Sequence, residues 1–130
     1  MYQRIILIGR LGRDPESRFL PDGTPVTTFS VATDRRWTDA NGQQQSKTVW
    51  FRVMAWRRLA ETCNQYLSKG QLVMVEGDVQ EPKPYQGKDG TWRASLDVTA
   101  RSVQFLSSKG ERQAEDAGGD GDTGEESIPF

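Results

Sequence analysis

The most constraining feature of the sequence is residues 49–56, a stretch whose alternate side chains differ in character. Successive side chains of a β-strand point to opposite sides of a sheet. One side of this stretch is wholly apolar, with Val49, Phe51, Val53 and Ala55. The other side carries Trp50, Arg52, Met54 and Trp56. The stretch therefore predicts a strand with one face in a core and a second face that combines two indoles with a guanidinium.

Two interpretations of that second face remain open. In the first, both faces are buried, as in a sandwich or at a subunit interface. Arg52 counts against this interpretation because a buried arginine needs a partner. In the second, the face is exposed and offers a platform for unpaired bases, which stack on aromatic rings without regard to sequence.

Alternation and turn signals predict four more strands and one helix. The strands cover residues 4–12, 26–37, 71–79 and 91–106, and the helix covers residues 57–68. The polar residues 38–46 are expected to form a loop. Five strands with one helix between the third and fourth are the order of the OB-fold, a small barrel that binds oligonucleotides. The predicted fold class is therefore all-β with one helix, as a five-stranded OB-fold barrel.

Three of these elements carry predictions about burial. The first strand is apolar on both faces, so we expect the core on one side and a neighbouring subunit on the other. The helix has a core-facing stripe at the usual spacing, formed by Leu59, Ala60, Cys63, Tyr66 and Leu67. Its position favours Cys63 as a core residue over a reactive thiol. The inward residues of the last strand are predicted to be Ala94, Leu96, Val98 and Ala100.

The amino-acid composition excludes several kinds of catalyst. The 130 residues include no histidine and a single cysteine, so the usual catalytic triads and zinc sites cannot be built. The acidic residues Asp34, Asp39, Glu76, Asp78 and Asp97 show no spacing typical of a magnesium site. We expect no enzyme, no catalytic residue, no metal site and no cofactor, with a magnesium-dependent nuclease as the remaining enzymatic alternative.

Charge divides the chain into two parts. Residues 1–106 carry 15 Lys and Arg against 11 Asp and Glu, a net charge of +4. Residues 107–130 carry 2 against 7, a net charge of −5, and few apolar residues. The basic part predicts a polyanionic ligand. The acidic part cannot bury enough surface to offset its chain entropy, so residues 107–130 are expected to be a disordered tail.

The acidic part ends on an apolar motif, Ile128-Pro129-Phe130, preceded by Glu125 and Glu126. One interpretation is a chain end without function. The other is a short linear motif in which Ile128 and Phe130 fill pockets on a partner and the carboxylates meet its basic residues.

The expected compartment is the cytoplasm, without membrane contact. No stretch of about 18 apolar residues is present. The sequence begins with a strand-like run that leaves no room for a signal peptide. A single cysteine also fits a reducing compartment.

Aromatic and basic residues fall where an OB-fold binds its ligand. Trp37, Trp50 and Trp56 lie on or beside the second and third strands. Tyr85 and Trp92 lie on the hairpin between the fourth and fifth. Positive charge along the path would come from Arg4, Arg52, Arg58, Lys69 and Lys83.

Several short segments of the chain follow a known pattern: ILIGRLGRDPE (6–16), FSVAT (29–33), WFRV (50–53), LAE (59–61), YLSKG (66–70), VEG (75–77) and IPF (128–130). In these segments the chain resembles bacterial single-stranded DNA-binding proteins. The resemblance implies a homotetramer of OB-fold subunits (residues 1–106) around which single-stranded DNA wraps, in a cytoplasmic, nucleoid-associated protein. It also implies a tail (residues 107–130) that recruits replication, repair and recombination proteins.

The resemblance also implies roles for individual residues. Base stacking is carried onto Trp37, Trp50, Trp56 and Tyr85, and contacts to the DNA backbone onto Arg4, Arg52, Arg58, Lys69 and Lys83. Partner docking is carried onto Glu125, Glu126, Ile128, Pro129 and Phe130. Trp92 is a DNA-binding prediction from its hairpin position alone.

Two residues depart from the family pattern. Phe51 stands where many relatives have a histidine near a subunit contact, and Ser127 stands where relatives usually have an acidic residue.

Two alternative functions remain open. One alternative function is an OB-fold module for single-stranded RNA, because indoles do not read the 2′-hydroxyl. The other is a purely structural assembly protein.

Overall fold

The computed structural model describes residues 1–107, so the predicted tail, apart from Ser107, lies outside the described residues. The first strands are β1 (Ile5–Leu11), β2 (Glu16–Phe19), β3 (Pro25–Thr38) and β4 (Gln44–Trp56). The helix α1 (Arg57–Tyr66) follows. The later strands are β5 (Leu72–Val79), β6 (Pro84–Gln86), β7 (Trp92–Ala94) and β8 (Asp97–Phe105).

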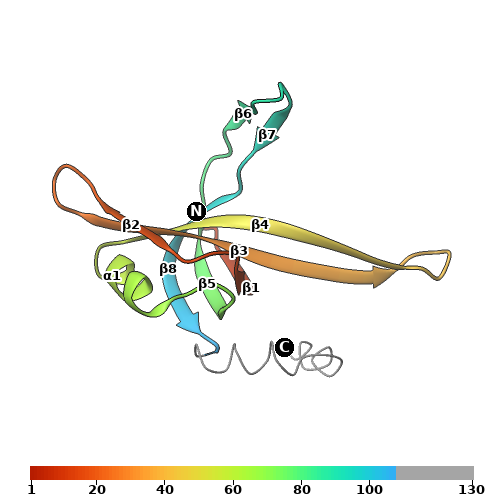
Figure 1. Ribbon diagram of the computed structural model, residues 1–130, viewed down its shortest axis with the longest axis horizontal. Coiled ribbons are helices and arrows are strands. Elements are labelled where there is room, and N and C mark those ends of the chain that lie inside the picture. The colour runs from red at the N-terminus through yellow and green to blue at the C-terminus, as the bar shows by residue number, and fades with distance from the viewer. Residues whose placement is uncertain (108–130) are drawn as a thin grey trace.

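Five strands close into a barrel in the order β1-β5-β8-β4-β3, with β1 pairing back onto β3 (Figure 1). All of these pairs are antiparallel except β4–β8. The closure needs a close approach of two backbones at Gly9, where a Cβ would lie 2.2 Å from the carbonyl oxygen of Ala32. Only glycine fits there. The predicted fold class, a five-stranded barrel with one helix between its third and fourth strands, is confirmed.

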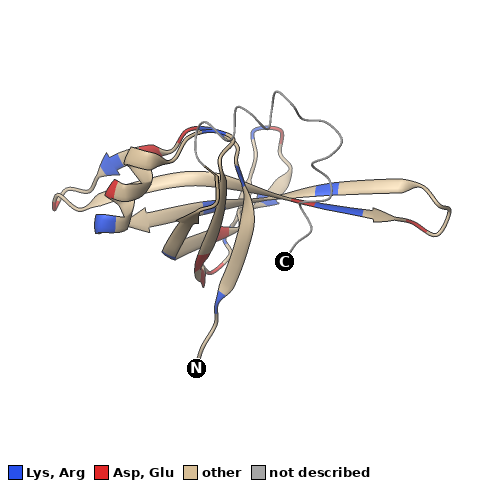
Figure 2. Cartoon of the chain, turned by 90° about the horizontal axis from the view of Figure 1, so that it is seen from below, with Lys and Arg blue, Asp and Glu red and all other residues tan. Residues whose placement is uncertain are grey.

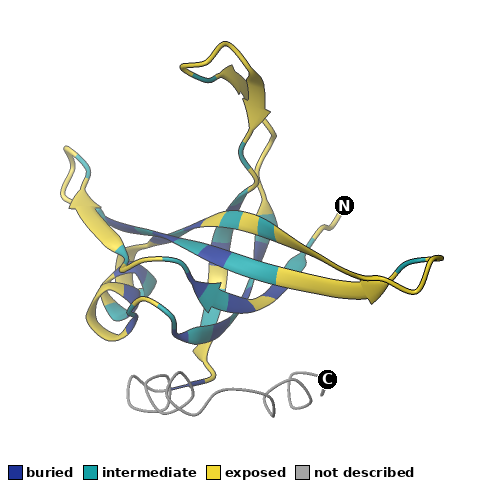
Figure 3. Cartoon of the chain, turned by 45° about the vertical axis from the view of Figure 1, so that its right-hand side comes forward, coloured by how far each residue is buried: buried dark blue, intermediate teal, exposed yellow. Residues whose placement is uncertain are grey.

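The core lies inside this barrel, and α1 covers one end of it (Figure 3). The helix contributes Ala60 and Cys63, and Leu67 follows it. Burial raises the pKa of the Cys63 thiol to about 12, because the interior disfavours a thiolate. The prediction that Cys63 is a core residue is therefore confirmed. The prediction for Tyr66 is wrong, since its ring is 51% exposed and lies 6.2 Å from the ring of Phe105.

The predicted last strand, residues 91–106, is instead two strands, β7 and β8. Its first part pairs with β6 in a separate sheet, the β6–β7 arm (residues 84–94), which projects from the barrel (Figure 1). Ala94 and Leu96 are therefore exposed, contrary to prediction, because the chain rejoins the barrel only at Asp97. Val98 and Ala100 point inward as expected.

The predicted loop over residues 38–46 is shorter in the structure, where only residues 39–43 lie between the two strands. Strands β3 and β4 pair without a break from Val26 and Trp56 to Thr38 and Gln44, and extend beyond the barrel as a long ribbon (Figure 1). A tight turn closes it, in which the Asp39 carboxylate accepts backbone N–H groups of residues 41 and 43. These bonds, chiefly the one from residue 43, lower the pKa of Asp39. Polar composition did not prevent strand pairing here.

The two faces of β1 differ in exposure. Leu7 and Leu11 are buried in the core, whereas Ile6 is 60% exposed and Ile8 37% exposed. The prediction of a core-facing side is confirmed. The opposite side is an apolar surface of the single chain.

Candidate nucleic-acid interface

The outer face of β4 carries the four residues that we name the β4 platform: Trp50, Arg52, Met54 and Trp56. Behind them, Val53 and Ala55 are completely buried. Trp50 is 53% exposed and Trp56 is 36% exposed. The predicted division of this strand into a core face and an exposed face is confirmed in the single chain.

The neighbouring strand leaves room over this platform because its outer residues are small. Ala32 lies opposite Trp50, Ser30 opposite Arg52, and Thr28 opposite Met54. Directly opposed residues of an antiparallel pair share a face of the sheet. Trp50 therefore has no large side chain opposite it on β3, whereas Trp56 lies opposite Val26.

Trp50 is oriented by a contact with the backbone of Gly12. A Cβ at Gly12 would lie 2.5 Å from Cζ3 and 2.7 Å from Cη2 of the indole. The ring thus occupies the space that any side chain at this position would need. Since the N–H of Gly12 donates to the Ser30 carbonyl (3.1 Å), the indole packs against a segment that is bonded to β3.

Arg52 is positioned from the β8 side of the platform. Its Nη1 lies 3.7 Å from Oδ2 of Asp97, and its side chain is 47% exposed. Asp97 also accepts a hydrogen bond from the Ser95 hydroxyl. The carboxylate therefore orients the guanidinium while leaving about half of it open to a ligand.

Trp37 does not share the platform. It pairs with Gln45 near the tip of the β3–β4 ribbon, and by alternation it faces the side opposite to Trp50 and Trp56. The Cζ atom of Arg35 lies 5.5 Å from the centre of its ring, in the range of a cation–π contact. Trp37 and Arg35 thus form a second, smaller aromatic and basic surface.

The β6–β7 arm presents its aromatic rings on two sides. Tyr85 pairs with Arg93, whereas Trp92 pairs with Gln86, so the two rings point in opposite directions. Tyr85 is 50% exposed and Trp92 is 68% exposed. Lys83 is also exposed, just before the arm's first strand.

Arg4 is engaged in ion pairs rather than free for a ligand. Its Nη1 lies 3.2 Å from Asp78 Oδ1, and its Nε donates to the Tyr2 hydroxyl. The hydrogen bond to Tyr2 is the main cause that raises its pKa. Arg101 bonds the other oxygen of Asp78 at 3.0 Å and lowers the pKa of that carboxyl group. A phosphate would compete with this network for Arg4.

Arg58 and Lys69 are exposed at the end of the barrel that α1 covers. Arg58 lies in the first turn of the helix. Lys69 lies in the turn before β5, where its backbone N–H donates to the Asp14 carboxylate at 2.8 Å. The structure therefore places Lys69 beside the β1–β2 connection, whereas Arg58 lies at the opposite, N-terminal end of α1.

Sequence reasoning missed the basic residues of the β3–β4 ribbon. Arg35, Arg36 and Lys47 lie on its projecting part, whose basic segments are visible in Figure 2. The adjacent Arg35-Arg36-Trp37 triplet was a usable signal. The polar residues that follow this triplet favour a loop, which hides the fact that the triplet lies on a paired ribbon.

The described residues contain no group of three or more acidic or cysteine side chains that could hold a metal ion. Within residues 1–107, no helix has the length and apolar character needed to cross a membrane.

A closed five-strand barrel with one helix and an aromatic outer wall defines an OB-fold protein. A sequence model of the single-strand binding protein family matches residues 2–106. The chain belongs to the single-strand binding protein family.

Two curated relatives illustrate the similarity. The single-stranded DNA-binding protein of Neisseria meningitidis serogroup A is 49% identical over 108 residues, which are 83% of this chain and 62% of the relative. That of Oceanobacillus iheyensis is 36% identical over 119 residues, 92% of this chain and 72% of the relative. The chain thus spans less than two thirds of the length of the Neisseria protein.

A solved structure shows the same architecture. The Plasmodium falciparum SSB in complex with ssDNA superposes with a TM-score of 0.70 and 28% sequence identity. The match covers 82% of this chain and 97% of that one.

Proposed function

We propose that this protein binds single-stranded DNA without strong sequence preference, through the β4 platform. The observation that carries the proposal is the exposure of Trp50, Arg52 and Trp56 on one face of β4. The family membership and the relatives' names support the choice of ligand.

Stacking and counterion release are the two sources of affinity. A base stacked on an indole contributes about 1–3 kcal/mol, the general range for proteins of this class. Phosphate contacts from arginine and lysine release counterions, so affinity falls as salt rises. Duplex DNA binds poorly because its bases are already stacked and cannot reach the indoles.

The proposal is tested by fluorescence anisotropy with labelled oligo-dT, the same length of duplex and the matching oligo-U. We expect tight binding of the single DNA strand, weakening with salt, and at least tenfold weaker binding of the duplex. Equal binding of duplex and single strand would overturn the proposal. Tighter binding of oligo-U would instead identify a module for single-stranded RNA.

The proposed assembly is a homotetramer, in which the outer face of β1 is covered by another copy. This part rests on the family resemblance and on the exposed side chains of Ile6 and Ile8. Ile8 pairs with Met74 of β5, which continues the apolar surface. Light scattering is expected to give four chains for the wild type and fewer for Ile6→Glu. A monomeric wild type would contradict the proposed homotetramer.

We propose that residues 107–130 recruit other proteins, those of replication, repair and recombination. The support is the sequence alone: Ile128, Pro129 and Phe130 follow the acidic pair Glu125 and Glu126. Capture of partners from a bacterial extract is expected with the full chain and lost with Phe130→Ala. Equal capture by both would remove this proposal without affecting DNA binding.

A further inference from the structure

The helix α1 begins on a residue with an unusual backbone conformation. Arg57 has a φ of 59°, in the left-handed region, and among residues 1–107 it is the only residue other than glycine with a positive φ. This region is crowded for any residue that has a Cβ, and glycine is the residue that normally occupies it. An arginine at this position therefore lowers the stability of the fold.

The charge of Arg57 is also unfavourable for the helix. The N-terminal end of a helix carries a partial positive charge, which acidic side chains stabilise and basic side chains oppose. The first turn of α1 holds Arg57 and Arg58 and no acidic residue, and the N-cap residue Trp56 makes no side-chain hydrogen bond. Neither the backbone nor the helix accounts for an arginine at position 57.

The neighbouring side chains do not hold the guanidinium of Arg57 either. Within residues 1–107 the exposed Arg57 side chain forms no hydrogen bond and no ion pair. Its charge acts on Asp22, in the turn between β2 and β3, whose pKa is lowered mainly by the backbone N–H of Thr24 and least by Arg57. The β2–β3 hairpin and α1 lie at the same end of the molecule (Figure 1). Arg57 is therefore directed toward this hairpin.

Arg57 directly follows the exposed indole at the end of the β4 platform. Trp56 lies opposite Val26 of β3, and Val26 lies opposite Arg18 of β2. Directly opposed side chains share a face of the sheet, so the outer face continues from Trp56 to Arg18. Val26 is completely buried between them, whereas Trp56 is 36% exposed. The indole thus has one exposed arginine two strands away and another next to it in the chain.

We propose that Arg57 binds the DNA phosphate next to the base stacked on Trp56, and that its left-handed backbone directs the guanidinium to that place. The proposal deepens the binding of single-stranded DNA proposed above and rests on it. A phosphate contact from an arginine releases counterions and adds affinity without sequence preference. The fold loses stability at position 57 and gains affinity there, which is the trade-off expected where backbone strain lies at a functional site.

Three substitutions separate the charge of Arg57 from its backbone. Arg57→Ala and Arg57→Gly both remove the guanidinium. In each, affinity for a short oligo-dT is expected to fall about fivefold, and the slope of log affinity against log salt to become shallower by about 0.7. Only Arg57→Gly relieves the backbone, so its Tm is expected to lie about 4 °C above that of Arg57→Ala. The matched control is Arg57→Lys, which keeps the charge and the strained backbone and is expected to bind within about twofold of the wild type.

The outcomes separate this proposal from the proposed function. Wild-type affinity and salt slope in both Arg57→Ala and Arg57→Gly would overturn the phosphate contact while leaving the proposed function intact. A Tm of Arg57→Gly no higher than that of Arg57→Ala would overturn the trade-off between backbone strain and binding. Failure of the wild type to bind oligo-dT would overturn both proposals.

Discussion

The β4 platform and the β6–β7 arm offer the same aromatic chemistry on different supports. Strand β4 pairs with β3 along thirteen residues and with β8 along three, and its inner side chains lie in the core. The arm is held together by three residue pairs, and its strands are exposed throughout (Figure 3). The rings of the platform are therefore fixed by folding, whereas those of the arm are fixed mainly by their own hairpin.

We expect this difference to decide how much each ring contributes to the proposed binding of single-stranded DNA. A side chain that must be ordered on binding loses part of its contact energy as entropy, about 0.5–1.5 kcal/mol for a flexible one. Trp50, held against Gly12, has less of this cost than Tyr85 or Trp92. We infer that the platform supplies most of the affinity and that the arm adds reach along the strand.

The largest expected effect is that of Trp50→Ala. Loss of one anchored stacking surface weakens oligo-dT binding roughly 10- to 100-fold. Anisotropy titrations at fixed salt measure it, with thermal unfolding as the check that the barrel survives. A loss of less than twofold would break the comparison, because the platform would then not be the main contact.

Gly12→Ala tests the support of the indole without touching the indole itself. The new methyl group would lie 2.5 Å from the ring of Trp50, so the ring has to leave its position. We expect oligo-dT affinity to fall about tenfold. The emission of the free protein also changes, because the ring moves. If the Gly12→Ala variant kept both the affinity and the emission of the wild type, the contact with Gly12 would not orient the ring.

The arm is tested by Tyr85→Ala and Trp92→Ala, each alone. Both rings are at least half exposed, so stability stays unchanged, and we expect a loss of about threefold in affinity for each. The same titrations with short and long oligonucleotides show whether the loss grows with length. A larger loss than that of Trp50→Ala would reverse the ranking of the two regions.

The smallest expected effect is that of Asp97→Asn, which frees Arg52 from its ion pair (3.7 Å). Because exposed pairs are weak, affinity is expected to rise only about two- to threefold, with a steeper salt dependence. Titrations at three salt concentrations measure the affinity and its dependence on salt. A weaker binding would mean that Asp97 holds Arg52 in its productive position.

The barrel was predictable because its signals are local. The alternation over residues 49–56 and the apolar stripe of the helix each bury one face, and the order of the elements along the chain matches that of an OB-fold. The sharp turn from β4 into α1 was not predictable. There Arg57 adopts a φ of 59°, a left-handed conformation that nothing in its side chain favours.

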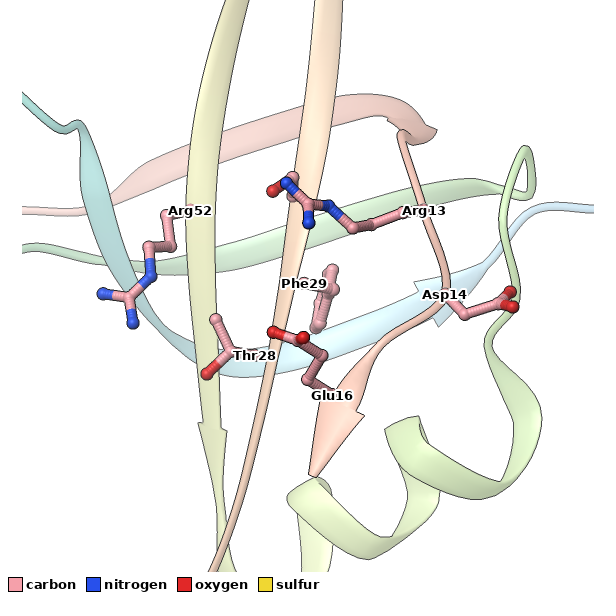
Figure 4. Close-up of a pocket in the computed structure, with 7 residues that line it drawn as sticks. Arg13, Asp14, Glu16, Thr28, Phe29 and Arg52 are labelled. Carbon is pink, nitrogen blue, oxygen red and sulfur yellow. The ribbon is translucent and has the colours of Figure 1, made fainter. Parts of the chain in front are cut away.

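The arrangement of the site was harder to predict than its residues. Sequence alone predicts the indoles as stacking residues, but register decides that Trp37 faces away from Trp50, and tertiary pairing places Arg4 beside Asp78. A pocket lined by Arg13, Glu16 and Arg52, among others, lies where the β1–β2 connection crosses β3 (Figure 4). Such contacts join residues that are distant in sequence, and no local pattern records them.

The most direct test of the account is the tryptophan quenching of Trp50→Phe and Trp92→Phe at saturating oligo-dT. Phenylalanine keeps a stacking ring but removes the indole signal at one position. The account predicts that Trp50→Phe loses a larger share of the quenching than Trp92→Phe, at nearly unchanged affinity. Quenching in Trp50→Phe equal to that of the wild type would show that this indole does not meet the bases, and would contradict the central claim.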